Sequence, residues 1–103
     1  MGIFSFLGFG AKTNDTVNDF VARGAVIIDV RTTGEYASGH ITNSKNIPLD
    51  SLLKQIDSIK KLKKPVIACC RSGMRSSQAV SILKQHQVEC MNGGSWDSLQ
   101  AKL

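Results

Sequence analysis

The sequence predicts a single α/β domain built on a mainly parallel sheet. Short apolar runs alternate along its 103 residues with segments whose apolar residues recur every three or four positions, and this alternation is typical of parallel α/β sheets. Residues 25–30 form a near-continuous apolar run, as expected of a strand covered on both faces. A second run, residues 65–69, is followed by Cys70, which therefore stands at the carboxyl end of its strand, where such sheets bind ligands.

The first elements are predicted from helix caps and breakers. Asn14 or Asp15 is expected to cap a helix that ends at Gly24. After the strand at 25–30, residues 33–38 suit one or two helical turns.

The second half of the chain continues the alternation. Asp50 is expected to cap a helix because apolar residues recur at helical spacing after it and Pro65 follows. The remaining elements are an extended piece at 45–47, the strand at 65–69, a helix at 75–85, a strand at 88–91, a turn at Gly93-Gly94 and a helix at 95–103.

The composition favours a folded domain and disfavours a nucleic-acid-binding protein. Hydrophobic residues make up 42% and charged residues 20% of the chain, which are ordinary globular values. The net charge of +5 comes partly from four lysines between residues 60 and 64, and these are interpreted as a solvated face that complements the end of a helix. A nucleic-acid surface combines basic residues with several aromatics, but the chain has one Trp and one Tyr.

Residues 1–13 are expected to form a tail and residues 14–103 the domain. The apolar residues of the tail are fewer than the roughly 20 that span a bilayer, and they fit neither a signal peptide nor a myristoylation site. Of the three cysteines two are adjacent, which disfavours a disulfide scaffold. The expectation is a cytoplasmic chain without integral membrane association.

His40 and two of the cysteines are expected to have structural roles. His40 and His86 fall in no metal-ligand pattern, so no metal is predicted. His40 is expected to make a structural hydrogen bond, and Cys69 and Cys90 are expected to pack in the core.

The segment Cys70–Ser76 carries the predicted chemistry. It joins a strand to a helix and contains a thiol, two arginines and a glycine. Backbone N–H groups at a helix start, with the charges of Arg71 and Arg75, favour an anion. Such a site stabilises the thiolate of Cys70 and makes it a nucleophile, whereas side-chain alternation directs Cys69 to the opposite face.

The other residues of this loop have supporting interpretations. Gly73 relieves the steric limits of a tight turn, and Met74 is expected to form an apolar wall. Ser72 and Ser76 either donate hydrogen bonds from their hydroxyls or, for Ser76, cap the following helix.

Several motifs in this order resemble the rhodanese-like domains. They are Asp29-Val30-Arg31, Glu35-Tyr36, Gly39-His40-Ile41, Asn46-Ile47-Pro48-Leu49, the Cys70–Ser76 loop, and Gly93-Gly94 followed by Trp96. The resemblance extends from about residue 14 to the C-terminus. It implies a central parallel sheet of about five strands flanked by helices on both faces.

The resemblance also implies an activity. Family members with an active loop transfer a sulfane sulfur from a donor such as thiosulfate to a thiophilic acceptor, through a persulfide that here falls on Cys70. The acceptor is cyanide in vitro and a thiol in vivo, and a protein can provide that thiol. The resemblance implies no cofactor. Asp29 and Arg31 match residues that brace the loop, with Glu35 as a partner of Arg31.

Two other functions remain open. One is a sulfur carrier or binding module without turnover. The other is a cysteine phosphatase or arsenate reductase, whose loop has five residues between Cys and Arg. Four residues separate Cys70 from Arg75, and only counting from Cys69 gives five. The shorter loop suits a sulfur atom better than a phosphoryl group.

Overall fold

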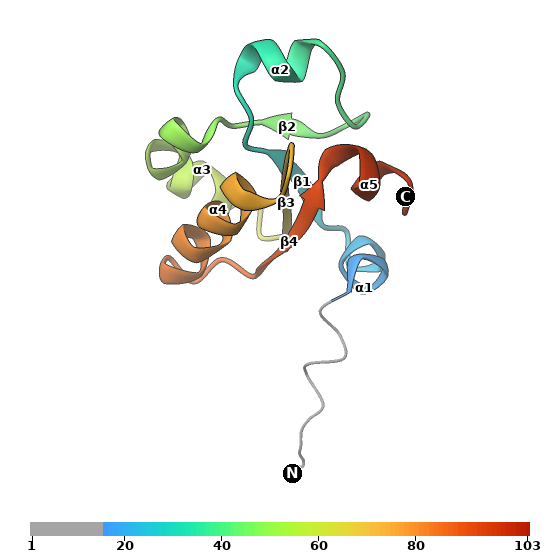
Figure 1. Cartoon of the computed structure of the whole chain (residues 1–103). Helices are drawn as coiled ribbons and strands as arrows, with labels where there is room; N and C mark the ends of the chain where they lie inside the picture. The colour runs from blue at the N-terminus through green and yellow to red at the C-terminus, as the bar shows by residue number, and fades with distance from the viewer. Residues whose placement is uncertain (1–15) are drawn as a thin grey trace.

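A four-stranded parallel sheet forms the centre of the computed structural model, which describes residues 16–103 (Figure 1). Its strands, in the spatial order β2-β1-β3-β4, are β1 (Val26–Asp29), β2 (Lys45–Asn46), β3 (Val66–Cys70) and β4 (Cys90–Ser95). The helical elements are α1 (Val17–Ala22), α2 (Thr33–Ala37), the 3₁₀ helix η3 (Leu49–Gln55), α3 (Ile56–Lys61), α4 (Met74–Gln85) and α5 (Trp96–Gln100). The predicted α/β class is confirmed, with four strands in the described residues rather than about five.

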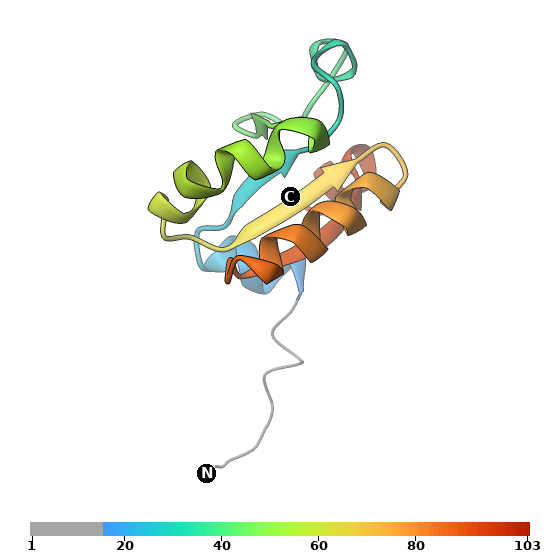
Figure 2. The same cartoon turned by 90° about the vertical axis from the view of Figure 1, so that its left-hand side faces the viewer.

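Helices cover both faces of the sheet, as predicted. On one face, η3, α3 and α4 pack over β1 and β3, and Figure 2 shows α3 and α4 in front of the strands. On the other face, Phe20 of α1 and Leu99 of α5 are fully buried against Ile67 and Cys69. The short α2 lies beyond the carboxyl ends of the strands, at the top of Figure 1.

The central strand β3 separates the two adjacent cysteines. All five of its residues are buried between β1 and β4. Because side chains alternate along a strand, Cys70 joins the core on the α4 face and Cys69 the core on the α1 face. Their predicted placement on opposite faces is confirmed.

Several element boundaries differ from the predictions. The N-cap of the helix expected after Asp50 is Pro48, which already has the extended conformation of a cap, so the helix begins at Leu49 as η3. Gly93 and Gly94 form no turn but continue β4 to Ser95. Thr16, whose hydroxyl accepts from the Asp19 N–H at 3.0 Å, caps α1.

Some expectations fall outside the described residues. The tail expected at 1–13 lies among them, as do Asn14 and Asp15, whose expected role as the cap of α1 belongs to Thr16. Within residues 16–103, no helix is long and apolar enough to cross a membrane.

Candidate functional site

Cys70 ends β3, and a short loop turns the chain from there into α4. The turn passes through Gly73, the residue that precedes the helix, at φ 98°. Residues with a side chain rarely adopt this left-handed conformation, so the conformation explains the glycine of the loop. Cys70 and Ser76 are both fully buried, and the loop folds over the sulfur.

Three hydrogen-bonding groups surround the Cys70 sulfur. The Gly73 N–H donates to Sγ at 3.0 Å and the Ser76 N–H at 3.4 Å. The Ser76 hydroxyl lies 3.4 Å from the same sulfur. The first turn of α4 thus presents its unpaired N–H groups to one atom, as a helix start does to an anion.

This environment distinguishes Cys70 from the other two thiols. Burial raises the pKa of Cys70, but its hydrogen bonds with the Ser76 hydroxyl and with the N–H groups of the loop outweigh burial, so the pKa lies below that of an ordinary thiol. For Cys69, burial together with the nearby Asp29 carboxylate raises the pKa to about 12. Burial raises the pKa of Cys90 to about 11. All three cysteines are free, and of the three only Cys70 has a pKa below the ordinary thiol value.

Arg75 forms an ion pair with Glu35 at the edge of the site. The two guanidinium nitrogens contact the two carboxylate oxygens at 2.7 and 3.0 Å. Glu35 also accepts from the Thr32 N–H in the capping box of α2. Hydrogen bonds from Arg75 first, and then from Thr32, lower the pKa of Glu35 to about 2.

This pairing corrects the expected partner of Glu35. Arg31 contacts Glu35 only through the main-chain carbonyl, to which its Nη1 donates at 3.3 Å. Its guanidinium instead binds Asp29, with contacts of 2.7 to 3.0 Å in which both side chains are almost fully buried. The carboxylate of Glu35 is therefore left to Arg75.

The Asp29–Arg31 pair ties three segments together. Arg31 Nη2 also donates to the Gly39 carbonyl at 2.7 Å, and its guanidinium lies 4.9 Å from the centre of the Trp96 ring. The pair therefore holds the end of β1, the segment after α2 and the start of α5 in one arrangement beside the Cys70 loop.

The remaining loop residues face outward. Arg71 and Ser72 are exposed, and 74% of Met74 is exposed. Within residues 16–103, Arg71 forms no ion pair with a carboxylate, in contrast to Arg75.

Asn92 of β4 is a site residue that the sequence analysis missed. Its Nδ2 donates to the Gly73 carbonyl at 3.0 Å, and its Oδ1 accepts from the Ser76 hydroxyl at 2.7 Å and the Gly94 N–H at 2.9 Å. The sequence predicted a strand at 88–91 followed by a turn at Gly93-Gly94. That prediction left Asn92 outside the sheet, whereas β4 continues to Ser95 and places Asn92 beside the Cys70 loop. An amide just before two glycines was the available signal.

His40 makes a structural contact, as the sequence predicted. Its Nδ1 lies 2.8 Å from the Tyr36 carbonyl, and its ring stacks on Tyr36 with the ring centres 3.8 Å apart. In residues 16–103, no three His, Cys, Asp or Glu side chains gather as metal ligands would.

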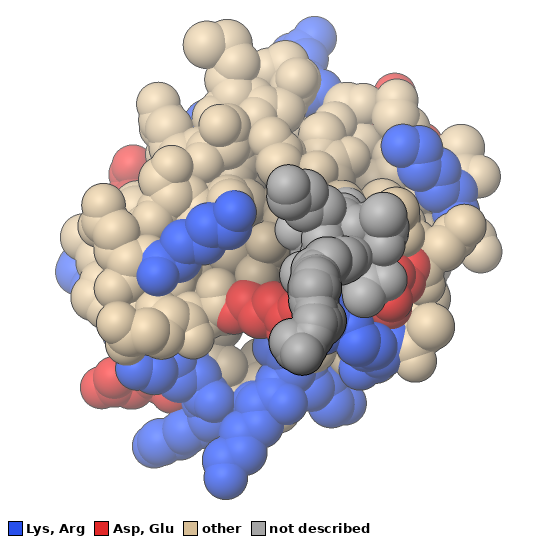
Figure 3. Space-filling view, turned by 90° about the horizontal axis from the view of Figure 1, so that it is seen from below, with Lys and Arg blue, Asp and Glu red and all other residues tan. Residues whose placement is uncertain are grey.

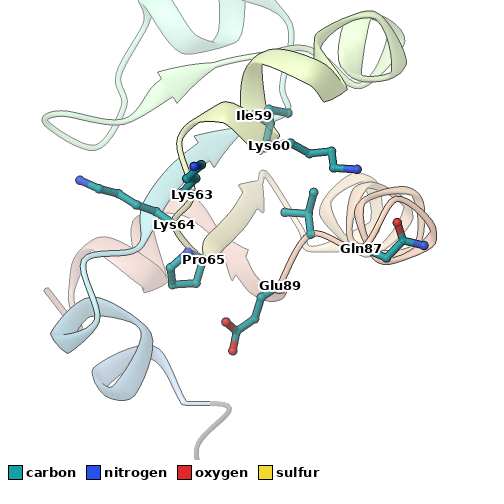
Figure 4. Close-up of a pocket in the computed structure, with 8 residues that line it drawn as sticks. Ile59, Lys60, Lys63, Lys64, Pro65, Gln87 and Glu89 are labelled. Atoms are coloured by element: carbon teal, nitrogen blue, oxygen red, sulfur yellow. The ribbon is translucent and has the colours of Figure 1, made fainter.

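A pocket of about 240 Å³ lies at the opposite end of β3 (Figure 4). It is lined by Ile59, Lys60, Lys63, Lys64, Pro65, Gln87, Val88 and Glu89. Helices α3 and α4 both end beside it, and basic side chains gather over this end of the molecule (Figure 3). Glu89 pairs with Arg23 at 2.8 Å. Lys60 lies in the last turn of α3, where its charge complements the C-terminus of that helix. No residue of the Cys70 loop lines the pocket.

Comparisons with known proteins agree on one family. The model of the Rhodanese-like domain matches residues 13–101. The uncharacterized protein YqhL of Bacillus subtilis is 41% identical over 64 residues, which are 62% of this chain and 50% of that protein. The thiosulfate sulfurtransferase GlpE of Pseudomonas fluorescens is 34% identical over 64 residues, 59% of this chain and 55% of its own.

The chain thus spans about half the length of these curated relatives. Among solved structures, a rhodanese-related protein from Thermoplasma volcanium matches with a TM-score of 0.70 and 27% identity. That match covers 84% of this chain and 88% of the other.

Proposed function

This chain belongs to the rhodanese-like domain family, and we propose that it is a sulfurtransferase that uses Cys70 as its nucleophile. The donor is a small anion with a sulfane sulfur, such as thiosulfate. The acceptor is a thiol, on a small molecule or a protein, with cyanide as its substitute in vitro. The observation that carries the proposal is the pair of backbone N–H donors on the Cys70 sulfur, from Gly73 at 3.0 Å and from Ser76 at 3.4 Å.

The chemistry follows from this arrangement. The Cys70 thiolate attacks the outer sulfur of thiosulfate, the sulfur–sulfur bond of the donor breaks, and sulfite leaves with the bonding electron pair. The product is a persulfide whose outer sulfur carries the negative charge. An acceptor nucleophile then attacks that outer sulfur, and Cys70 leaves as a thiolate. Both half-reactions begin or end with charge on the same sulfur, which the loop donors stabilise.

The charged side chains of the loop support an anionic donor. Arg71 is exposed beside the thiol and available to a doubly charged anion. Arg75 contributes a charge that Glu35 partly neutralises. The buried pair of Asp29 and Arg31 braces the neighbouring segments, as a rigid site requires.

The phosphatase alternative has less support. Its spacing requires Cys69 as the nucleophile, but Cys69 packs in the core on the face away from α4 and the loop, and its pKa is raised to about 12. The sulfur-carrier alternative uses the same persulfide and differs only in turnover.

Thiocyanate formation from thiosulfate and cyanide tests the proposal. We expect activity in the unmodified chain, none in Cys70→Ala and most of it in the matched control Cys69→Ala. Equal loss in both variants would overturn the assignment of Cys70. Persulfide formation on Cys70 without turnover would favour the carrier, and phosphate ester hydrolysis without thiocyanate would favour the phosphatase.

A further inference from the structure

Main-chain partners determine the orientation of the Asn92 amide. The Gly94 N–H can only donate, so the atom 2.9 Å from it is the amide oxygen Oδ1. The Gly73 carbonyl can only accept, so the atom 3.0 Å from it is the amide nitrogen Nδ2. The Ser76 hydroxyl lies 2.7 Å from the same Oδ1. Because that oxygen carries no proton, Ser76 is the donor in this bond.

This orientation limits what Ser76 can do for Cys70. A serine hydroxyl has one proton and two lone pairs. With its proton directed at Asn92, Ser76 can only accept from Cys70, whose sulfur is 3.4 Å from the hydroxyl oxygen. This arrangement suits the neutral thiol. A thiolate has no proton to donate and would face a lone pair, unless the hydroxyl turns and donates to the sulfur.

We infer that Asn92 competes with the Cys70 sulfur for the single proton of the Ser76 hydroxyl, and is therefore a positioning residue of the reactive thiol. In the thiol form the hydroxyl donates to Asn92. When Cys70 releases its proton to solvent, the hydroxyl rotates to donate to the sulfur and its bond to Asn92 breaks. No covalent bond of Ser76 or Asn92 changes, and the only proton that leaves is that of Cys70.

The fold of β4 supports a dedicated role for Asn92. Its neighbour Gly93 is an extra residue in β4, inserted between the partners of Ala68 and Cys69. Such bulges re-aim side chains and are frequent beside active sites. A Cβ on Gly93 would lie 2.8 Å from Cγ2 of Ile67, so only glycine fits there. The bulge at Gly93 separates Asn92, whose amide contacts Gly73 and Ser76, from Gly94, whose N–H donates to the Asn92 side chain.

Sharing of the Ser76 proton would also matter during sulfur transfer, and this one consequence rests on the proposed function. Charge resides on the Cys70 sulfur before it attacks the donor and after the acceptor removes the outer sulfur. In the persulfide the Cys70 sulfur is neutral, and Ser76 can return to Asn92. Asn92 therefore lowers the fraction of Cys70 that is thiolate in the resting protein. In the steps in which the Cys70 sulfur is charged, the Ser76 hydroxyl is free to turn and donate to it.

Substituting Asn92 changes no charge around Cys70. The ionisable groups of the packed elements are Arg71 and Arg75 of the loop and α4, Glu35 of α2, Asp29 of β1 with its partner Arg31, the neighbouring Cys69, and Cys90 of β4. Asn92 contacts none of their side chains in the described residues.

The test is a four-member cycle of Asn92→Ala and Ser76→Ala, all in a Cys69→Ala background. The rate of iodoacetamide reaction at Cys70 is measured against pH by mass spectrometry, and circular dichroism confirms that each variant is folded. We expect Asn92→Ala to lower the pH midpoint by about 0.5–1 unit, the equivalent of one ordinary hydrogen bond. Ser76→Ala should raise the midpoint, and more so when Asn92 is absent.

Two results would overturn the inference. One is an equal effect of Ser76→Ala with and without Asn92, which means that the two residues do not share the proton. The other is a higher midpoint in Asn92→Ala, which means that Asn92 only braces the loop. The alkylation rate requires no sulfur donor, so these outcomes are distinguishable from a failure of sulfur transfer.

Discussion

Arg75 and Glu35, 40 residues apart in the chain, form a two-point ion pair with nitrogen–oxygen distances of 2.7 and 3.0 Å. The pair joins the first turn of α4, which also holds the Cys70 sulfur, to α2 at the carboxyl end of the sheet. Because Arg75 also lies in the electrostatic field of Cys70, Glu35 determines how much positive charge the site offers to an anion.

Removing the Glu35 carboxylate should therefore strengthen the binding of an anionic donor. In Glu35→Gln, Arg75 keeps its charge without a carboxylate partner, and we expect the KM for thiosulfate to fall by roughly two- to fivefold, the range of partly exposed charge interactions. Arg75→Ala should raise the KM. Steady-state thiocyanate formation measures both. The matched control is Glu89→Gln at the opposite end of the sheet, which should leave the KM unchanged; the same KM in Glu35→Gln and the parent chain would contradict this role.

The same pair predicts a pH-dependent contribution to stability. An ordinary Glu pKa is 4.5, and the hydrogen bonds from Arg75 and Thr32 lower that of Glu35 to about 2. Glu35 therefore stabilises the folded chain above pH 4.5, and this contribution is lost as the pH falls toward 2. Urea unfolding at several pH values between 4.5 and 2 measures this contribution. As the pH falls, the unfolding free energy should decrease less in Glu35→Gln than in the unmodified chain. Parallel curves for the two chains would mean that the pair does not form in solution.

A methyl group added to Gly93 should destabilise the fold. The new Cβ would lie 2.8 Å from Ile67 and 2.9 Å from Leu99, both fully buried. Overpacking of this kind lowers the unfolding free energy by about 1–3 kcal/mol. Gly34→Ala is the control because a Cβ there meets nothing within 4 Å, and a helical glycine gains roughly 0.5–1 kcal/mol on replacement. Urea midpoints that fall equally, or not at all, would contradict the crowded bulge.

The three thiols should differ in their reaction with iodoacetamide. Cys70 is expected to react first in the folded chain near neutral pH because its pKa lies below that of an ordinary thiol, whereas the pKa values of Cys69 and Cys90 are raised to about 12 and 11. Mass spectrometry follows the labelling. Cys69→Ala should keep the fast-reacting thiol and Cys70→Ala should lose it; the reverse result would exchange the roles assigned to the two cysteines.

Local patterns predicted much of the fold. The apolar runs located the central strands, and side-chain alternation placed Cys69 and Cys70 on opposite faces, because strand periodicity is a property of adjacent residues. The position of Cys70 at the carboxyl end of β3 followed from the same pattern.

The missed features depend on contacts between distant segments. Glu35 has a cationic residue four positions before it, yet its carboxylate binds Arg75, because Arg31 is already committed to the buried Asp29. The role of Asn92 required the bulge at Gly93, and a glycine pair looks like a turn until packing shows that a Cβ on Gly93 would clash with the core. Tertiary contacts decided both.

The intact mass of the chain after treatment with thiosulfate tests the central claim most directly. A persulfide adds one sulfur, about 32 Da, and dithiothreitol removes it. We predict this gain in the unmodified chain and in Cys69→Ala, and its absence in Cys70→Ala. A gain that persists in Cys70→Ala, or no gain in the unmodified chain, would contradict sulfur transfer through Cys70.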